Sequence, residues 1–319
     1  MALANQRLDN MTDNLDSLPL NELARVIAPG SQLARAWKLS GGMSADMTVL
    51  ELTGPEGGAR RVVLRRPPAA EAEFQILRAI HALGLTAPTP LALDVSGQIL
   101  PAPYLVMEYI EGAPEFAPTE RDSFARQLAA HLAAIHRAGL TAGKTGVDLS
   151  FLPALPSGFE AFCGLPPAQP DDALQLSRIR AALQPTWPFP RHNAPTLLHS
   201  DYWPGNVLWR AGRLAAVIDW EDAALGDPLI DLATSRLDLL WIIGPDVMEA
   251  FTRYYLSETG INATSLPYWD LAAALRLARL IGANLQEWAA FFHPFGRTDI
   301  TAQTIQANFH AFVEQAFRS

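Results

Sequence analysis

Three side chains between residues 201 and 219 have the types and spacing needed to handle metal-bound phosphate. Asn206 lies five positions after Asp201, and Asp219 lies thirteen positions after Asn206. Phosphoryl transfer needs a carboxylate near the incoming hydroxyl and oxygen ligands that hold Mg²⁺ across the phosphates. The segment therefore predicts a site at which Mg²⁺-bound phosphate is transferred.

A β-hairpin is expected to bring two of these side chains together. Val207–Trp209 and Leu214–Ile218 have strand character, and Ala211–Arg213 is a plausible turn between them. Asn206 precedes the first strand and Asp219 follows the second, and an antiparallel hairpin returns its two ends to within a few ångströms of each other. Amide and carboxylate oxygens are the hard donors that Mg²⁺ selects.

The first part of the chain reads as strand, helix and strand. Val62–Arg66 is a β-branched run, and Tyr104–Ile110 is an apolar run before Gly112. Between them, apolar residues recur at helical spacing and stop before Gly84. These patterns predict a first lobe over residues 1–110, with the lobe boundary near Glu111 to Pro118.

The remainder, residues 111–319, is predicted to be a mainly helical lobe. Residues 119–122 resemble a capping box, and the apolar stripe that follows predicts a helix ending at Gly139. Nine prolines between Leu152 and Pro195 predict short helices and loops there. Helices are expected again after the hairpin.

Composition excludes several classes of protein. The net charge of -9, without a basic block, argues against a nucleic-acid groove and favours a cationic or neutral small substrate. Residues 1–20 lack signal-peptide character, and charged residues interrupt the apolar stretches 229–243 and 271–285. We therefore expect a soluble cytoplasmic protein without a membrane span, in which Cys163 is a buried small hydrophobe.

The motifs together resemble the aminoglycoside phosphotransferase family, relatives of the protein kinases. The resemblance is carried by LHSDYWPGNVL at 198–208, VIDW at 217–220 and GDPLIDLA at 226–233. It implies an α+β, bilobal, protein kinase-like fold with a β-rich N-terminal lobe and a larger helical C-terminal lobe. Ser200 departs from the pattern, because many relatives have glycine there.

The resemblance also implies roles for individual residues. Asp201 would orient and partly deprotonate the acceptor hydroxyl, while Asn206 and Asp219 would hold Mg²⁺. Asp231 would brace the catalytic loop through backbone hydrogen bonds, and His199 would be a packed structural residue.

Further parts of the family pattern occur in the N-terminal half. Residues 39–44 resemble the loop that covers the phosphates of ATP or GTP, and residues 105–112 resemble the hinge that receives the base. The nucleotide-binding residues implied in this way are Gly41, Gly42, Ser44, Arg65, Glu73, Met107, Glu108, Tyr109 and Ile110. Arg65 would grip the phosphates and Glu73 would be its helical partner.

Several alternatives stay open at this stage. Arg66 competes with Arg65, because adjacent strand residues face opposite ways. Glu221, Asp222, Asp270 and Glu287 could bind substrate amines, although solvation at the surface is the favoured interpretation of each. Most of the tryptophans and phenylalanines of the second half are expected in the core rather than in a substrate pocket. The acceptor-binding residues, the choice between ATP and GTP and the oligomeric state are not predicted.

Three functions fit these residues. The leading one is a small-molecule kinase that transfers phosphate to an alcohol group. The second is a catalytically inactive, nucleotide-binding module. The third is a metal-dependent phosphoester hydrolase built from His199, Asp201, Asp219 and Asp222, which would leave the first hundred residues unexplained.

Overall fold

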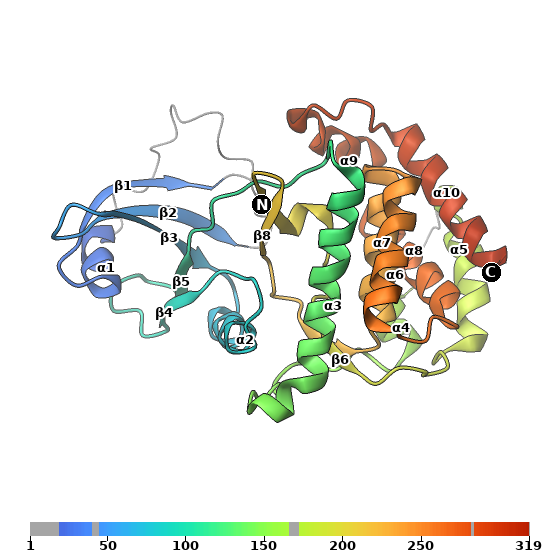
Figure 1. The fold of residues 1–319 in the computed structure, drawn as a ribbon, viewed down its shortest axis with the longest axis horizontal. Coiled ribbons are helices and arrows are strands. Elements are labelled where there is room, and N and C mark those ends of the chain that lie inside the picture. Colours follow the sequence, from blue (N-terminus) through green and yellow to red (C-terminus); the bar gives the residue numbers. More distant parts are fainter. Residues whose placement is uncertain (1–18, 40–44, 166–171, 282–283, 319) are drawn as a thin grey trace. The chain divides into compact units, whose positions relative to one another are not determined.

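The computed structural model describes residues 19–39, 45–165, 172–281 and 284–318, which form two compact units (Figure 1). Unit 1 takes in residues up to 114 together with 205–221, and unit 2 takes in 115–204 and 222 onward. The segment 205–221 thus belongs to the first unit, whereas the sequence patterns placed every residue after 110 in a second lobe. Backbone hydrogen bonds between Ala113 and Trp209, at 2.8 and 3.1 Å, attach this segment to the end of the first part of the chain.

Unit 1 combines a five-stranded sheet, two helices and a hairpin. Its elements are α1 (Leu20–Ile27), β1 (Gln32–Lys38), β2 (Asp46–Thr53), β3 (Ala59–Arg66), α2 (Ala70–Ala82), β4 (Pro90–Asp94), β5 (Tyr104–Glu108), β7 (Val207–Arg210) and β8 (Arg213–Val217).

The sheet has the strand order β1-β2-β3-β5-β4 and is antiparallel throughout. The strand predictions at 62–66 and 104–110 are confirmed by β3 and β5, and the helix before Gly84 is confirmed by α2. In α2 the apolar side chains of Leu77 and Ile80 are buried, as the helical spacing indicated. β1, β2 and β4 had no counterpart in the sequence prediction.

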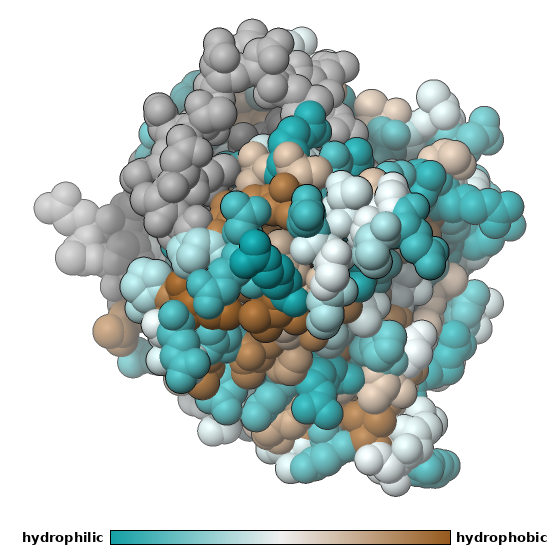
Figure 2. All heavy atoms as spheres, turned by 90° about the vertical axis from the view of Figure 1, so that its left-hand side faces the viewer, coloured by the Kyte–Doolittle hydropathy of each residue, from teal (hydrophilic) through white to brown (hydrophobic). Residues whose placement is uncertain are grey.

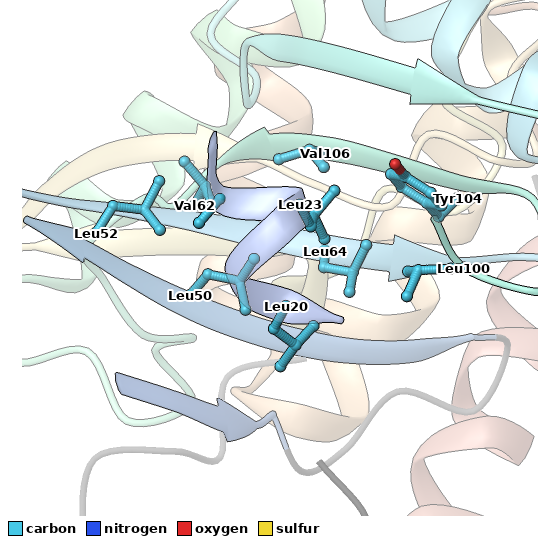
Figure 3. Close-up of a cluster of buried hydrophobic side chains, with 10 residues drawn as sticks. Leu20, Leu23, Leu50, Leu52, Val62, Leu64, Leu100, Tyr104 and Val106 are labelled. Atoms are coloured by element: carbon cyan, nitrogen blue, oxygen red, sulfur yellow. The ribbon is translucent and has the colours of Figure 1, made fainter. Parts of the chain in front are cut away.

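One face of the sheet is covered by α1 (Figure 3). Leu20 and Leu23 of α1 pack on Leu50 of β2, Val62 and Leu64 of β3, and neighbouring apolar side chains. Because alternate strand residues face opposite sides, Val63 and Arg65 of β3 are directed to the other face. Arg65 is therefore presented on the face of the sheet opposite α1.

The outer surface of unit 1 is mixed rather than uniformly polar. Figure 2 shows hydrophilic side chains around a central group of apolar ones on this face. Among the described residues of this unit, the large apolar side chains of Val26 and Val95 are exposed, at 58% and 57%.

Unit 2 is mainly helical. Its longer elements are α3 (Arg121–Thr145), α4 (Phe159–Cys163), α5 (Leu176–Leu183), β6 (Thr196–Leu198), β9 (Ala224–Gly226), α6 (Leu229–Ile242), α7 (Pro245–Thr259), α8 (Leu266–Ile281), α9 (Leu285–Phe291) and α10 (Ala302–Arg318). Short 3₁₀ turns add Asp172–Leu174, Gln184–Thr186 and His293–Phe295, and Pro204–Asn206 forms another at the boundary between the units. The predictions of short helices in the proline-rich segment and of helices after the hairpin are confirmed.

The predicted end of α3 was wrong. Gly139 lies inside this helix, which continues to Thr145 and is capped by Gly146 in the left-handed conformation, with a φ of 77°. A Cβ atom at Gly139 would lie 2.3 Å from both the Leu197 amide nitrogen and the Thr196 Oγ1. The glycine therefore permits β6 to approach the helix. The expected capping box is also absent, because the N-cap residue Glu120 makes no side-chain cap hydrogen bond.

The core of unit 2 is built around α6. All but one of its fourteen residues are buried, and this includes the charged Arg236 and Asp238. Arg236 pairs with Asp270 of α8 through two nitrogen–oxygen contacts of 3.1 Å. The expectation that Asp270 is a solvated surface residue was therefore wrong: it is 4% exposed, and its carboxylate neutralises a buried guanidinium.

Cys163 at the end of α4 is fully buried, as expected for a small hydrophobe. Burial raises the pKa of its thiol to about 11, although the charges of Arg180, Arg279 and Arg276 oppose that shift. Within the described part of the chain, no helix has both the length and the apolar character that a membrane crossing needs.

Candidate active site

In unit 1, the β7–β8 hairpin brings the two expected Mg²⁺ ligands to one end of a short ladder. Its turn is formed by Ala211 and Gly212, both with positive φ, which is the backbone of a tight two-residue hairpin. At the open end, the Ile218 amide donates a hydrogen bond of 2.9 Å to the Asn206 carbonyl oxygen. Asp219 follows directly, with a φ of 65° that turns the chain out of the strand. Asn206 and Asp219 are therefore neighbours across the hairpin.

The environment of these two side chains suits a hard divalent cation. Asn206 is 3% exposed and the Asp219 side chain 23%, so an ion there would be largely shielded from water. The Asp219 carboxylate already attracts one cation, because the Arg65 Nη2 lies 3.1 Å from its Oδ1. An amide oxygen, a carboxylate and phosphate oxygens are a donor set that fits Mg²⁺.

Arg65 is the basic residue of β3 that points inward. Its side chain is 1% exposed, and its Nε donates to the Glu73 carboxylate of α2 at 2.8 and 3.0 Å. Its Nη2 contacts both Asp219 and Glu221, the latter at 2.7 Å. Arg66 instead pairs with Asp46 and keeps 23% of its side chain exposed. Strand alternation thus separates the two candidate cations.

The charges of this group support one another. Burial acts against the charge on Arg65, but Glu73, Asp219 and Glu221 raise the pKa of the guanidinium above its ordinary value. Burial also raises the pKa of Glu73, against the opposing effect of Arg65. Glu221 is exposed, as the sequence interpretation expected, but its carboxylate is also a partner of Arg65, which was not foreseen.

The expected hinge lies at the end of β5. Met107 is buried and pairs with Val63 of β3, while the Glu108 carboxylate accepts hydrogen bonds from the Thr89 hydroxyl at 2.7 Å and from its amide at 3.4 Å. Tyr109 and Ile110 continue beyond the strand, and Ile110 packs with Leu208, Ala216 and Ile218 of the hairpin segment. Gly41, Gly42 and Ser44, expected to cover the phosphates, lie outside the described residues.

In unit 2, the loop that carries Asp201 is held by one buried carboxylate. The Asp231 Oδ2 accepts a hydrogen bond of 2.7 Å from the His199 amide, and its Oδ1 accepts one of 2.9 Å from the Ser200 amide. Burial alone would raise the pKa of Asp231, but the hydrogen bond and charge of His136, together with His199, hold it below its ordinary value. Asp231 therefore remains an acceptor for both amides.

His199 is fully buried and supports the same loop. Its Nδ1 lies 3.3 Å from the Asp201 amide, which can donate to it only if that nitrogen is unprotonated. Ser200 between them has a φ of 67°, a left-handed conformation that favours glycine. The departure from glycine at this position is thus accommodated at a cost in backbone strain.

His136 of α3 completes this support and was missed by the sequence interpretation. It is buried, and its two ring nitrogens lie 2.5 Å from the Tyr255 hydroxyl and 3.3 Å from the Asp231 Oδ2. The available signal was a histidine one position after Ile135, at the end of the apolar stripe of the predicted helix. A histidine in that position is more often a packed residue than a ligand, so the signal was weak.

A second acid of α6 lies within electrostatic range of Asp201. Asp238 is 8% exposed, and burial raises its pKa to about 7, with a further increase from the charge of Asp201. The Trp241 indole donates a hydrogen bond of 3.0 Å to its Oδ1. Asp238 was not singled out from the sequence, because a lone acid on an apolar helix carries no motif.

Comparison with known proteins identifies the family. Residues 38–289 match the APH family, described as the phosphotransferase enzyme family. The chain belongs to this family.

Relatives of this chain include acyl-CoA dehydrogenase family member 11 from Rattus norvegicus. The two sequences are 24% identical over 290 residues, and the match covers 79% of this chain and 37% of that protein. Viomycin phosphotransferase from Streptomyces vinaceus is 29% identical over 197 residues, which are 55% of the chain and 67% of that protein. The matched segment spans between 20% and 37% of the length of the acyl-CoA dehydrogenase relatives.

Solved structures of similar fold include two ligand-bound phosphotransferases. A thermostable mutant of an aminoglycoside phosphotransferase, in a ternary complex with AMP-PNP and hygromycin B, has a TM-score of 0.61 at 20% identity and covers 92% of this chain and 97% of its own. A spectinomycin phosphotransferase in complex with ADP and spectinomycin has a TM-score of 0.61 at 17% identity and covers 93% and 96%. The α+β, kinase-like fold expected from the sequence is therefore confirmed for this member of the family.

The aromatic side chains of the second half mostly follow the core interpretation. Trp209, Trp220, Trp241, Trp269 and Phe292 are buried. Trp203 and Phe291 are half-buried and belong to an aromatic group in unit 2 that includes Phe116, which stacks on Trp203 at 6.0 Å between ring centroids.

Among the described residues, no group of three or more His, Cys, Asp or Glu side chains is arranged to hold a metal ion.

Proposed function

We propose that this chain is a Mg²⁺-dependent phosphotransferase that moves the γ-phosphate of ATP or GTP to a hydroxyl group of a small molecule. One observation carries the proposal: Arg65 contacts both Glu73 and Asp219, which lies 154 residues further along the chain. The residue types and their order match what phosphate positioning requires, namely a cation, an acid that orients it and a carboxylate for the metal. Membership of the phosphotransferase enzyme family supports the same activity.

In this proposal, unit 1 binds the nucleotide. Arg65, oriented by Glu73, binds the phosphates, and residues 107–110 receive the base mainly through their backbone, since the Glu108 carboxylate is engaged by Thr89. Gly41, Gly42 and Ser44 cover the phosphates. Asn206 and Asp219 hold Mg²⁺, which when bound neutralises charge on the phosphates.

Asp201 is the proposed catalytic residue. Its carboxylate accepts a hydrogen bond from the acceptor hydroxyl and takes the proton as the new oxygen–phosphorus bond forms and the nucleoside diphosphate leaves. Asp231 and His199 keep its backbone in place, which limits the reorganisation needed during the reaction.

The test is nucleotide turnover with a panel of hydroxyl-bearing acceptors: aminoglycosides, macrolides, choline-like amines and amino alcohols. Wild-type protein should consume ATP or GTP in an acceptor-dependent and Mg²⁺-dependent manner. Asp201→Asn should lower kcat by roughly 10²- to 10⁴-fold, the contribution of a positioned acid-base group. Asp148→Asn, a change at an exposed loop carboxylate, is the matched control and should leave kcat unchanged.

The outcomes separate the alternatives. Nucleotide binding without transfer to any acceptor or to water would indicate the inactive module. Hydrolysis of a phosphate ester without added nucleotide would indicate the metal-dependent hydrolase. A loss of less than tenfold in Asp201→Asn would remove the role assigned to that carboxylate.

A further inference from the structure

The partners of Arg65 leave a charge imbalance in unit 1. Three carboxylates, those of Glu73, Asp219 and Glu221, contact one guanidinium, so the group carries a net charge of 1 - 3 = -2 when all are ionised. Arg65 is 1% exposed, and Glu73 is also buried. The side chains of Asp219 and Glu221 are 23% and 32% exposed, so a further cation can reach this excess negative charge and neutralise part of it.

The nitrogens of Arg65 are divided among different partners. Nε is bound to Glu73, Nη1 lies 3.6 Å from the Met47 sulfur, and Nη2 is shared between Asp219 at 3.1 Å and Glu221 at 2.7 Å. The contact with Glu221 is the shorter of the two Nη2 contacts. Asp219 can therefore leave Nη2 while the guanidinium keeps one acid on each side.

The carboxylate of Asp219 has two possible partners. It is a partner of Arg65 in this structure, and in the proposed function it is also a ligand of Mg²⁺. The carboxylate of Glu221 has 32% of its side chain exposed, so it can follow small movements of the guanidinium. Glu221 is thus suited to retain Arg65 when Asp219 turns to a metal ion.

We propose that Glu221 is a positioning residue that keeps Arg65 in its phosphate-binding orientation when Asp219 changes its partner from Arg65 to the divalent cation. This inference rests on the proposed function. Glu221 acts through Arg65 and not as a metal ligand. It therefore contributes to the gain in nucleotide affinity that Mg²⁺ provides.

The test compares the affinity for ADP in EDTA with that in excess Mg²⁺, measured by titration calorimetry on the full chain. The quantity of interest is the ratio of the Kd in EDTA to the Kd in Mg²⁺, which measures how much Mg²⁺ raises the affinity for ADP. Glu221→Gln should lower this ratio about tenfold, the equivalent of one hydrogen bond to a charged group. Affinity in EDTA should be unchanged or higher, because a negative charge near the phosphates has been removed.

Glu51→Gln is the matched control. Glu51 of β2 pairs with Arg61 of the same sheet at 2.9 Å, and 23% of its side chain is exposed, so the same change removes a comparable ion pair away from Arg65. The control should leave the ratio unchanged. A ratio in Glu221→Gln equal to that of wild type, in protein that binds ADP, would overturn the inference and leave the proposed function intact.

A double-mutant cycle separates positioning from direct metal binding. In Arg65→Lys, a single ammonium replaces the fork that reaches Glu73 and Glu221 on separate arms, and the charge needed for folding is kept. Adding Glu221→Gln to this variant should have less than a twofold further effect on the ratio. A full tenfold further loss would show that Glu221 binds the metal itself and would overturn the inference, while failure of wild type to bind ADP at all would overturn both proposals.

Discussion

Near Asp201, the pKa values of the acids of α6 are set by burial and buried hydrogen bonds more than by exposed ion pairs. Asp231 is buried and ionised because histidines and two amides stabilise its charge, whereas Asp238 is buried and has a pKa raised to about 7. Two acids of one helix therefore differ in protonation below about pH 7, where Asp231 is ionised and Asp238 is mostly protonated. The difference arises from their partners: Asp231 has the His136 ring and two backbone amides, while Asp238 has the Trp241 indole.

Asp238 should make stability depend on pH. An unfolded Asp ionises near pH 3.9, so between about pH 4 and pH 7 the folded chain holds a proton that the unfolded chain has lost. Stability from this group is thus greatest at low pH and falls by roughly 4 kcal/mol as pH rises through this range. Asp238→Asn, which keeps an oxygen for Trp241, should remove this fall and unfold at higher urea than wild type at pH 8.

The measurement is urea unfolding followed by circular dichroism at pH 5 and pH 8. Asp148→Asn serves as the control, since the exposed Asp148 has a pKa lowered by the Ser150 amide and hydroxyl and cannot produce a fall with rising pH. Equal pH dependence in Asp238→Asn and wild type would show that Asp238 is ionised throughout.

Individual residues were predicted from the sequence only where a local pattern specifies them. The backbone contacts of Asp231 follow a motif that the sequence displays in full. The contacts of Arg65 with Asp219 and Glu221 join residues 154 and 156 positions apart, and no periodicity encodes such a pairing. Asp270 was misjudged because most carboxylates are solvated, and burial of the exceptions is decided by tertiary packing.

Among the elements, α3 shows how a helix is adapted to a neighbouring strand. Its glycines at 139 and 143 have the same propensity cost, but their surroundings differ. A Cβ at 139 would collide with β6, whereas a Cβ at 143 would meet no atom within 4 Å. Gly139 was taken as a helix end because glycine commonly terminates helices, and its role in close packing is visible only when β6 is placed.

The two glycines provide an internally controlled test. Gly143→Ala should stabilise the protein by about 0.5–1 kcal/mol, the usual helix preference of alanine over glycine. Gly139→Ala should instead destabilise it by about 2 kcal/mol or more, because β6 must move. Thermal unfolding of both variants measures the two shifts, and a Gly139→Ala variant as stable as Gly143→Ala would contradict the close approach of β6.

The hairpin and the strands β3 and β5 were predicted well, because turn residues and β-branched runs act locally. β1, β2 and β4 were missed, as their identity depends on pairing within the sheet. The loop at 39–44 was interpreted by motif, and its residues 40–44 lie outside the described ones.

Considered as a chain of two units, the molecule divides its proposed chemistry between them. The described candidates for nucleotide and metal binding, from Arg65 to Asp219, belong to unit 1, while Asp201 and its support belong to unit 2. The chain passes from one unit to the other between Pro204 and Gly205, within the proposed catalytic loop.

This division predicts where a nucleotide protects the backbone. In hydrogen–deuterium exchange, ADP with Mg²⁺ should slow exchange in β3, β5 and the β7–β8 hairpin of unit 1, since ligands stabilise the segments they contact. Exchange in α10 of unit 2, which carries none of the implied nucleotide ligands, should change little and serves as the internal control. Removal of Mg²⁺ with EDTA should reduce the protection of the hairpin most, and protection confined to unit 2 would contradict the assignment of the nucleotide site.

Alkylation of the buried thiol of Cys163 can report transient opening of the native fold around α4. Alkylating reagents attack the thiolate, which is scarce at neutral pH when the thiol pKa is about 11, and the sulfur is inaccessible in the native fold. Incorporation of a maleimide therefore counts only those excursions in which the end of α4 separates from its arginine-rich surroundings. Because the chain has no other cysteine, every labelled molecule reports one opening of unit 2.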